Sequence, residues 1–376
     1  MVALVRGADA PSAIASEMQK FVADQTIAGA VTLVAHHGKI LSLNAVGQAD
    51  LASGRPMKPD TMFWIASMTK PIAATAVMIL QDDLKLSVDD PVGKYLPAFQ
   101  SPTIVGGGTP SQPLTIRHLL THTSGLSSPP PEVGAASASL ADFVDQVAKL
   151  PLQFEPGSQW KYGVGLSVAG RIVEIVSGKS FEQFIAQRIF QPLEMNDTTF
   201  YPSVEQRQRL ATIYRFNDST KQLEPAPPPV FINVDPALRR APNPSGGLAS
   251  TAEDYYRFLQ MVLNGGELNG KRVVSADAVQ QMTSVQTGDL KGGFVPGSAW
   301  GLGWSLVREP QGVTASLNPG SYGHGGAFGT QAWTDPKLGA IYIMLIQRFG
   351  LPNSDASAMR RTFQQAAHEL IVSPRP

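Results

Sequence analysis

A serine and a lysine three residues apart lie in one long apolar stretch of this chain. Between Thr61 and Gln81 the only charged residue is Lys70, and Ser67 precedes it by three positions. A helix that begins near Ser67 would be apolar on every side, which is typical of a buried helix, and would place both side chains on one face. The stretch therefore predicts a buried helix that carries a hydroxyl beside an amine.

Such a pair can perform nucleophilic catalysis. Apolar surroundings disfavour the charged form of Lys70, so its pKa should fall and its amine can accept a proton. The hydroxyl of Ser67 would lie at a helix N-terminus, where backbone N–H groups favour developing negative charge, so we expect it to form an acyl-enzyme. The same spacing recurs at Ser158 and Lys161, but this pair follows Pro156-Gly157 in an expected loop, where Lys161 has no reason to lose its water.

Two further segments contain groups suited to a cleft. Tyr162 precedes a helix expected over about 166–176 and could deliver its phenol to a cleft, although a core tyrosine explains it as well. The segment 322–329 combines aromatic residues, His324 and four glycines at the entrance of a strand. Such a backbone can approach a ligand closely and line an oxyanion site, or it can form a β-bulge.

The histidines do not suggest a metal site. His118 and His122 have the spacing of a helical zinc pair, but Leu119 stands where zinc proteases have glutamate, and no third ligand suggests itself. The chain has no cysteine, which excludes disulfides and zinc–thiolate sites. We therefore expect neither a metal nor another cofactor.

Composition argues against several classes of partner. The 376 residues carry 30 basic and 30 acidic side chains, and a net charge of zero argues against nucleic acid or an anionic membrane as partner. The sequence has no apolar run of membrane-spanning length, and residues 1–10 do not read as an export signal. These features predict a soluble, cytoplasmic protein.

The two ends of the chain are expected to meet in one sheet. The expected elements are a helix over 12–24, strands over 29–35 and 40–46, strands over 328–334 and 340–346, and a closing helix over 355–371. A helix and hairpin at the start and a hairpin and helix at the end predict an α+β fold, with one antiparallel sheet assembled from both termini and flanked by helices.

The middle of the chain reads as mainly helical. Residues 1–60 and 301–376 would form the lobe with the sheet, residues 61–300 a mainly helical lobe of the same domain, and the active-site cleft would lie between the two. Within the helical lobe, 250–253 (STAE) reads as a capping box that opens a helix ending at Leu263.

Three of these signals occur in the order that is typical of one superfamily. Ser67-x-x-Lys70, Tyr162 and His324-Gly325-Gly326 resemble the motifs of the serine β-lactamases and penicillin-binding proteins. The chain is most similar to the class C β-lactamase-like group and, within it, to the family VIII carboxylesterases. The segments 119–126 (LLTHTSGL) and 246–251 (GGLAST) also resemble this group. The resemblance runs from the first hairpin to the closing helix.

The resemblance implies a role for each catalytic group. Ser67 would be the nucleophile and Lys70 its neighbouring base, while Tyr162 would help to move the proton to the leaving group. Which of Lys70 and Tyr162 takes the serine proton stays open. The backbone N–H groups of Ser67 and Ala327 would form the oxyanion hole.

The third motif and one neighbour of Tyr162 depart from class C β-lactamases. His324, Gly325 and Gly326 would edge the cleft and contact substrate, but His324 replaces the lysine of those enzymes, and Val164 replaces their asparagine. A histidine is mostly neutral at pH 7, so both anchors for an anionic substrate are missing while the acyl-transfer groups remain. We expect a carboxylesterase that acts on short-chain, uncharged esters, with weak β-lactam hydrolysis at most.

Other interpretations stay open beside this one. Trp300, Trp333 and Phe328 are candidates for an apolar substrate pocket, although core packing accounts for them equally well. Within the superfamily the alternatives are a β-lactamase, a D-aminopeptidase, a D,D-peptidase, and an acyltransferase or transesterase. A catalytically idle scaffold is the alternative from another class, and the presence of all three catalytic motif residues counts against it.

Overall fold

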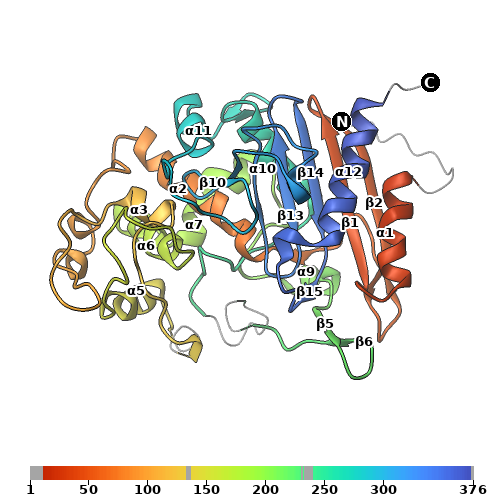
Figure 1. Ribbon diagram of the computed structural model, residues 1–376, viewed down its shortest axis with the longest axis horizontal. Helices are drawn as coiled ribbons and strands as arrows, with labels where there is room; N and C mark the ends of the chain where they lie inside the picture. Colours follow the sequence, from red (N-terminus) through yellow and green to blue (C-terminus); the bar gives the residue numbers. More distant parts are fainter. Residues whose placement is uncertain (1–11, 133–136, 230–231, 233–239, 374–376) are drawn as a thin grey trace.

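The computed structural model describes residues 12–132, 137–229, 232 and 240–373. Within this part of the chain, eight strands form one antiparallel sheet in the order β10-β11-β12-β13-β14-β1-β2-β3. The strands are β1 (Gly29–His36), β2 (Lys39–Asp50), β3 (Arg55–Pro56), β10 (Ser298–Trp300), β11 (Ser305–Val307), β12 (Tyr322–Gly325), β13 (Gln331–Asp335) and β14 (Ala340–Leu345). Figure 1 shows this sheet with helices on both of its faces.

Strands from the two ends of the chain meet inside the sheet. β1 pairs with β14, so that Val31 lies opposite Leu345 and Ala35 opposite Ile341. Both strands are almost entirely buried, because helices cover both faces. The expected antiparallel sheet assembled from both termini is thereby confirmed.

Successive side chains along each strand point to opposite faces of the sheet, and each face packs into a separate hydrophobic core. On one face, α1 (Ala13–Ala23) and α12 (Ala358–Val372) pack together, and Met18 and Phe363 share a hydrophobic cluster with Val34 of β1. On the other face, α10 (Ala252–Leu263) contacts β1 and β14, and Phe258 shares a cluster with Leu33. The helices and the sheet thus hold each other from both sides.

The start of α10 differs from the expected capping box. Thr251 is the N-cap, and its hydroxyl accepts a hydrogen bond from the backbone N–H of Asp254. Ser250 belongs to the short strand β7 (Ala249–Ser250), and its hydroxyl lies 2.8 Å from that of Thr198. The capping box predicted from Ser250 and Glu253 is therefore wrong, because pairing of β7 with β4 (Phe63–Trp64) keeps Ser250 in a strand.

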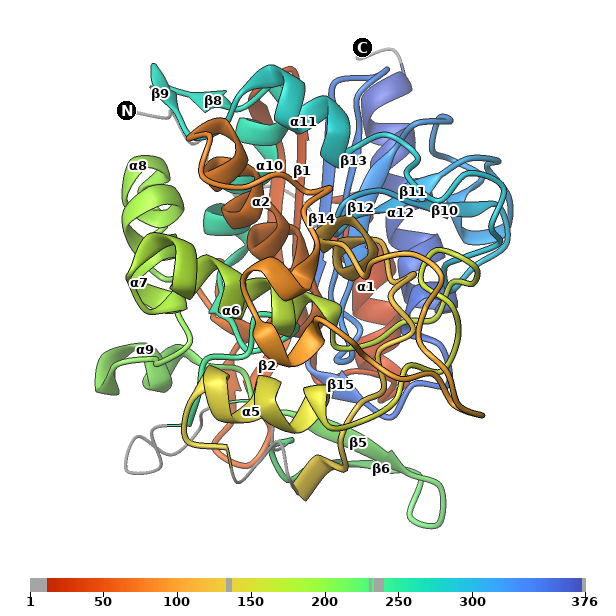
Figure 2. The same cartoon turned by 90° about the vertical axis from the view of Figure 1, so that its left-hand side faces the viewer.

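The centre of the helical part is α2 (Thr69–Asp82). Every residue from Thr69 to Leu80 is buried, as the apolar sequence predicted, and Pro71 occupies the third position, where its missing N–H costs little. Figure 2 looks onto this end of the molecule, where α2 lies beside α6 (Gly165–Ser177).

Shorter elements complete the described chain. They are the helices α3 (Ile116–Leu120), α5 (Leu140–Ala148), α7 (Phe181–Ile185), α8 (Gln191–Leu193), α9 (Val204–Arg209) and α11 (Ala276–Met282), and the strands β5 (Tyr214–Asn217), β6 (Gln222–Pro225), β8 (Glu267–Leu268), β9 (Lys271–Arg272) and β15 (Arg348–Phe349). Among the residues described, no helix has the length and apolarity needed to span a membrane. Residues 1–10, read above for an export signal, lie outside the described part.

Candidate active site

The serine and lysine of the apolar stretch lie in contact at the start of α2. Ser67 belongs to a short 3-10 helix, Ala66–Met68, that leads into α2, and Lys70 lies in the first turn of α2. The Nζ atom of Lys70 is 3.1 Å from the Oγ atom of Ser67. Ala66 adopts a left-handed φ of 45°, which is uncommon for a residue other than glycine. The turn before the serine thus stores strain at a position where a nucleophile is expected.

Lys70 is buried and has no acidic partner among the described residues. Its side chain is 2 % exposed, its Nζ atom donates a 2.6 Å hydrogen bond to the carbonyl oxygen of Ser245, and it lies 4.4 Å from the ring centre of Tyr162. Burial lowers the pKa of Lys70 from 10.5 to about 7, because the charged form is poorly solvated there. A large fraction of the amine is therefore neutral at pH 7. The sequence carried no signal for Ser245, since it contributes a backbone carbonyl.

Tyr162 comes from the loop before α6 and faces this amine. Its hydroxyl is buried and has no hydrogen-bond partner among the described residues. Burial raises the pKa of Tyr162 far above its usual value, and the nearby Ser67 hydroxyl offsets only part of this effect. The phenol therefore stays protonated over the physiological pH range.

His324 lies on β12, close to the same tyrosine. Its ring centre is 6.2 Å from that of Tyr162, and its Nδ1 atom is 2.6 Å from the carbonyl oxygen of Gly325. A carbonyl oxygen only accepts, so Nδ1 carries the proton and Nε2 is an acceptor. Burial and the charge of Lys70 lower the pKa of His324 to about 3. The position that holds lysine in class C β-lactamases is thus a neutral group here.

The turn after β12 lies against the segment that carries the serine. A Cβ atom on Gly326 would come within 2.5 Å of the carbonyl oxygen of Ile65, so only glycine permits this approach. Gly326 donates its N–H to the carbonyl of Thr330, whereas the exposed Ala327 has no backbone acceptor for its N–H within the described chain. The N–H of Ser67 lies at the start of a helix, where such groups lack intrahelical partners. Both N–H groups expected for an oxyanion hole are thus on neighbouring segments.

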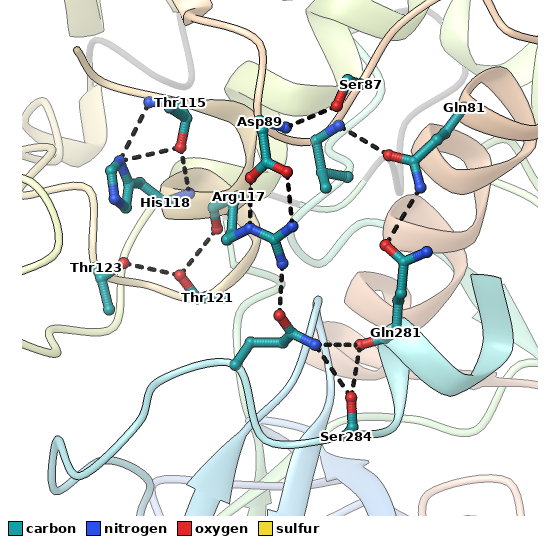
Figure 3. Close-up of polar contacts among 12 residues, drawn as sticks. Gln81, Ser87, Asp89, Thr115, Arg117, His118, Thr121, Thr123, Gln281 and Ser284 are labelled. Atoms are coloured by element: carbon teal, nitrogen blue, oxygen red, sulfur yellow. Dashed lines mark hydrogen bonds and ion pairs between the residues drawn. The ribbon is translucent and has the colours of Figure 1, made fainter. Parts of the chain in front are cut away.

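Sequence reasoning named His122 but did not place it beside Tyr162. The ring centre of His122 lies 4.4 Å from that of Tyr162. The spacing had suggested a comparison with helical zinc pairs, but α3 ends at Leu120, and His122 has a left-handed φ of 60°. Figure 3 shows that His118 is engaged elsewhere, in a reciprocal cap with Thr115. The segment LLTHTSGL was the only signal that pointed to His122.

A cavity of about 230 Å³ opens beside Ser245, whose carbonyl oxygen accepts the hydrogen bond from Lys70. Apolar side chains form most of its wall, and its polar lining residues are Ser128, Ser137, Ser167, Arg240, Asn243 and Ser245. Its lining residues include Pro129, Pro130, Leu140, Phe143, Val164, Ser167, Pro242, Asn243 and Ser245. Val164, which replaces the asparagine of class C enzymes, therefore presents an apolar surface between Tyr162 and this cavity.

The three aromatic candidates for a substrate pocket lie elsewhere. Trp300 packs edge-on against His324 at 5.5 Å between ring centres. Trp333 is buried beneath the guanidinium group of Arg360, 4.2 Å away, and Phe328 is fully buried in a separate hydrophobic cluster. None of the three lines the cavity beside Ser245. Trp300 lies in the aromatic cluster around His324 and Tyr162, whereas β13 and the turn after β12 place Trp333 and Phe328 in hydrophobic clusters.

The second Ser-x-x-Lys pair forms no comparable site. The hydroxyl of Ser158 donates to the carbonyl of Glu155, and the amine of Lys161 donates to Gln153, so the two side chains have separate partners. Both residues are exposed. Only the pair within the buried helix combines contact with burial.

Known proteins with similar sequences and structures include esterases. The Beta-lactamase family model matches residues 14–367. Esterase EstB from Burkholderia gladioli is 33% identical over 352 residues, which are 86% of this chain and 86% of that protein. Penicillin-binding protein 4 from Amycolatopsis lactamdurans is 32% identical over 308 residues, covering 81% of this chain and 76% of its own.

Solved structures agree with this assignment. EstCE1, described as a hydrolase with promiscuous acyltransferase activity, has a TM-score of 0.80 and 25% identity, and the match covers 95% of this chain and 97% of that one. Simvastatin synthase from Aspergillus terreus shares the fold, with a TM-score of 0.77 at 22% identity over 95% of this chain and 96% of its own. The chain therefore belongs to the beta-lactamase family, in the class C β-lactamase-like and penicillin-binding-protein-like group of serine hydrolases that includes the family VIII esterases.

Proposed function

We propose that this protein is a carboxylesterase that hydrolyses short-chain, uncharged esters through an acyl-enzyme on Ser67. The observation that carries the proposal is the contact between Ser67 and Lys70, 3.1 Å apart, in which burial lowers the pKa of the lysine to about 7. A base whose pKa lies near the working pH is well suited to accept a proton from a neighbouring hydroxyl.

The acylation step begins at this contact. The neutral amine of Lys70 takes the proton of Ser67 while the Oγ atom attacks the ester carbonyl carbon. The backbone N–H groups of Ser67 and Ala327 then stabilise the oxyanion. When the tetrahedral intermediate collapses, the bond to the alkoxy oxygen breaks. Tyr162 donates its phenolic proton to that oxygen and regains a proton from Lys70. The high pKa of Tyr162 supports this order of roles, with Lys70 as the base and Tyr162 as the proton donor.

Deacylation returns the site to its starting state. A water molecule attacks the acyl carbonyl carbon and gives one proton to the amine of Lys70. The bond between the carbonyl carbon and the Oγ atom of Ser67 then breaks, and the Lys70 proton returns to that oxygen. The products are a carboxylic acid and the alcohol released earlier.

The electrostatics around the site favour an uncharged substrate. His324 is neutral and Val164 is apolar, so the two positions that anchor a substrate carboxylate in class C β-lactamases carry no cation here, and Arg240 is the cationic residue in the described lining of the cavity. The cavity beside Ser245 would take the acyl chain. At about 230 Å³ it is smaller than the pockets that hold drug-sized ligands, which favours a short chain.

The test compares an ester with a β-lactam. Turnover of p-nitrophenyl butyrate and of nitrocefin is measured for the wild type, for Ser67→Ala and for Ser158→Ala, with intact-mass analysis of the protein during turnover. We expect fast ester turnover, little nitrocefin turnover and an adduct that maps to Ser67. Ser158→Ala is the matched control from the exposed pair and should behave like the wild type.

Any other result of this assay would change the proposed function. Faster turnover of nitrocefin than of the ester would place the protein with the β-lactamases despite Val164 and His324. Turnover of neither substrate would favour a peptidase or a scaffold. Substantial ester hydrolysis by a folded Ser67→Ala variant would show that Ser67 is not the nucleophile.

A further inference from the structure

We propose that His122 is a positioning residue for Tyr162, an inference that rests on the function proposed above for this tyrosine. The backbone N–H of Lys161 donates a 2.9 Å hydrogen bond to the carbonyl oxygen of His122, and the backbone N–H of Gly163 donates a 3.4 Å hydrogen bond to its Nδ1 atom. These donors are the two neighbours of Tyr162 in the chain. One residue therefore holds the backbone on both sides of the phenol.

Contact between the rings adds to this hold. The ring centres of His122 and Tyr162 are 4.4 Å apart and the ring planes are tilted by 42°. Trp300 lies against His122 at 5.1 Å between ring centres, so the imidazole is itself enclosed. With its backbone held and its ring in contact, the side chain of Tyr162 has few other orientations available.

The loop that carries Tyr162 follows the segment around His122 over a longer distance. The N–H of Gln153 donates to the carbonyl of Gly125 at 2.7 Å, and the N–H of Gly157 donates to the carbonyl of Thr123 at 2.8 Å. A Cβ atom on Gly125 would come within 2.5 Å of the carbonyl oxygen of Phe154. Backbone hydrogen bonds thus hold the loop 153–163 along the segment 121–125, which serves as its template.

This template is fixed to α3 by side chains that Figure 3 shows. The hydroxyl of Thr121 donates to the carbonyl of Arg117 at 2.8 Å and lies 2.8 Å from the hydroxyl of Thr123. Arg117 in turn makes two hydrogen bonds to Asp89, at 2.7 and 3.0 Å. His122 therefore lies between two threonines that are anchored, and movement of its ring is restricted.

The state of the imidazole suits this task. His122 is buried, and burial together with the charge of Lys70 holds its pKa well below the usual range. Because Nδ1 accepts the N–H of Gly163, the proton of the neutral ring lies on Nε2. A protonated ring would lose this acceptor. The left-handed φ of 60° adds a second requirement, which asparagine meets better than most residues.

These two requirements define the test variants. His122→Asn keeps an acceptor close to the position of Nδ1 and tolerates the left-handed backbone. His122→Leu keeps the bulk without an acceptor, and His122→Gln moves the amide one bond further out. For the purified full chain we expect the Leu and Gln variants to lower kcat for p-nitrophenyl butyrate about 10- to 100-fold, with KM changed less than about twofold. This loss is smaller than the roughly 100- to 10,000-fold of a removed general acid–base group, because Tyr162 itself is still present. The kcat of the Asn variant should stay close to that of the wild type.

A control and a double-mutant cycle separate positioning from a general loss of stability. His118→Asn alters the other histidine of the segment, which caps α3, and should lower the thermal unfolding midpoint without changing kcat. In a Tyr162→Phe background, His122→Gln should cost less than about twofold in kcat, because the group that it positions is already gone.

The outcomes distinguish this inference from the proposed function. A full loss of kcat from His122→Gln in the Tyr162→Phe background, or an Asn variant no better than Leu, would overturn the positioning role alone. Wild-type kcat in the Gln variant would do the same. A wild type that does not hydrolyse the ester would overturn the proposed function and this inference together.

Discussion

The carbonyl oxygen of Ser245 lies 2.6 Å from the Nζ atom of Lys70, although 175 positions separate the two residues in the chain. Because a carbonyl only accepts, this contact uses one N–H of the amine and leaves the lone pair free to face Ser67. Ser245 is held in turn, since its N–H donates to the side chain of Asn243 at 3.0 Å and its hydroxyl lies 2.7 Å from that of Ser167. A distant backbone group thus orients the proposed base.

The rate of ester hydrolysis should depend on the protonation of Lys70. Its pKa in the folded protein is about 7, and only the neutral amine accepts a proton, so kcat/KM should rise with pH through about 7. Below this value the rate should fall about tenfold per pH unit. A pH series from 5 to 9 with p-nitrophenyl butyrate measures this, and a flat profile across pH 7 would contradict the role of Lys70.

Removal of either proton-transfer group should slow catalysis. We expect Lys70→Ala and Tyr162→Phe each to lower kcat at least about 100-fold, the range for general acid–base catalysis. Steady-state kinetics at pH 8, with circular dichroism to verify folding, tests both variants. Lys161→Ala is the matched control, because its amine is exposed and bonded to Gln153. Full activity in either catalytic variant would show that its role is assigned incorrectly.

The buried amine should also destabilise the fold. Lys70 has a pKa of 10.5 in the unfolded chain and about 7 in the folded one, so between these values the unfolded chain binds more protons and the free energy of unfolding rises with pH. The difference between the two pKa values lowers the free energy of unfolding by about 5 kcal/mol at pH values below 7, where the amine is protonated in both states.

Lys70→Met removes this penalty at some cost, because the carbonyl of Ser245 loses its donor. We expect the free energy of unfolding to increase by at least about 1 kcal/mol at pH 6, with a smaller gain at pH 9. Urea unfolding at both pH values measures the change, and the exposed Lys20→Met provides the comparison. A Lys70→Met variant less stable than the wild type at pH 6 would contradict the buried-charge interpretation.

A cation at the third motif should shift the substrate preference. His324→Lys would place an ammonium group near the edge of the cleft and close to Lys70, where the neutral imidazole lies now. We expect the ratio of kcat/KM for nitrocefin, which carries a carboxylate, to that for p-nitrophenyl butyrate to rise about tenfold, as for one new charge-assisted contact. The control is His324→Gln, which adds no charge. A ratio that is the same in both variants would show that charge at this position does not select the substrate.

Much of the local structure and the choice of motifs could be read from the sequence. The hydrophobic pattern from Thr61 to Gln81 predicted the buried helix that begins beside Ser67 and contains Lys70, and strand-like runs joined by turn residues predicted the hairpins that join in one sheet. Such patterns are readable because helix and strand periods, turn residues and the cost of burying a charge act between neighbours in the chain.

Other features depended on which segments pack together. Ser245 contributes a carbonyl that every residue possesses, so its role leaves no side-chain signal in the sequence. His122 belongs to the segment LLTHTSGL, but its ring contacts a loop that follows it by some forty positions, and that partner cannot be read from the sequence. Trp333 and Phe328 resembled pocket residues, yet β13 and the turn after β12 place them in hydrophobic clusters. The sequence by itself determined the fold class and pointed to Ser67 and Lys70 as the candidate reactive pair. Only the tertiary structure decided which backbone groups orient that pair and which apolar side chains face a cavity, because those contacts join segments far apart in the chain.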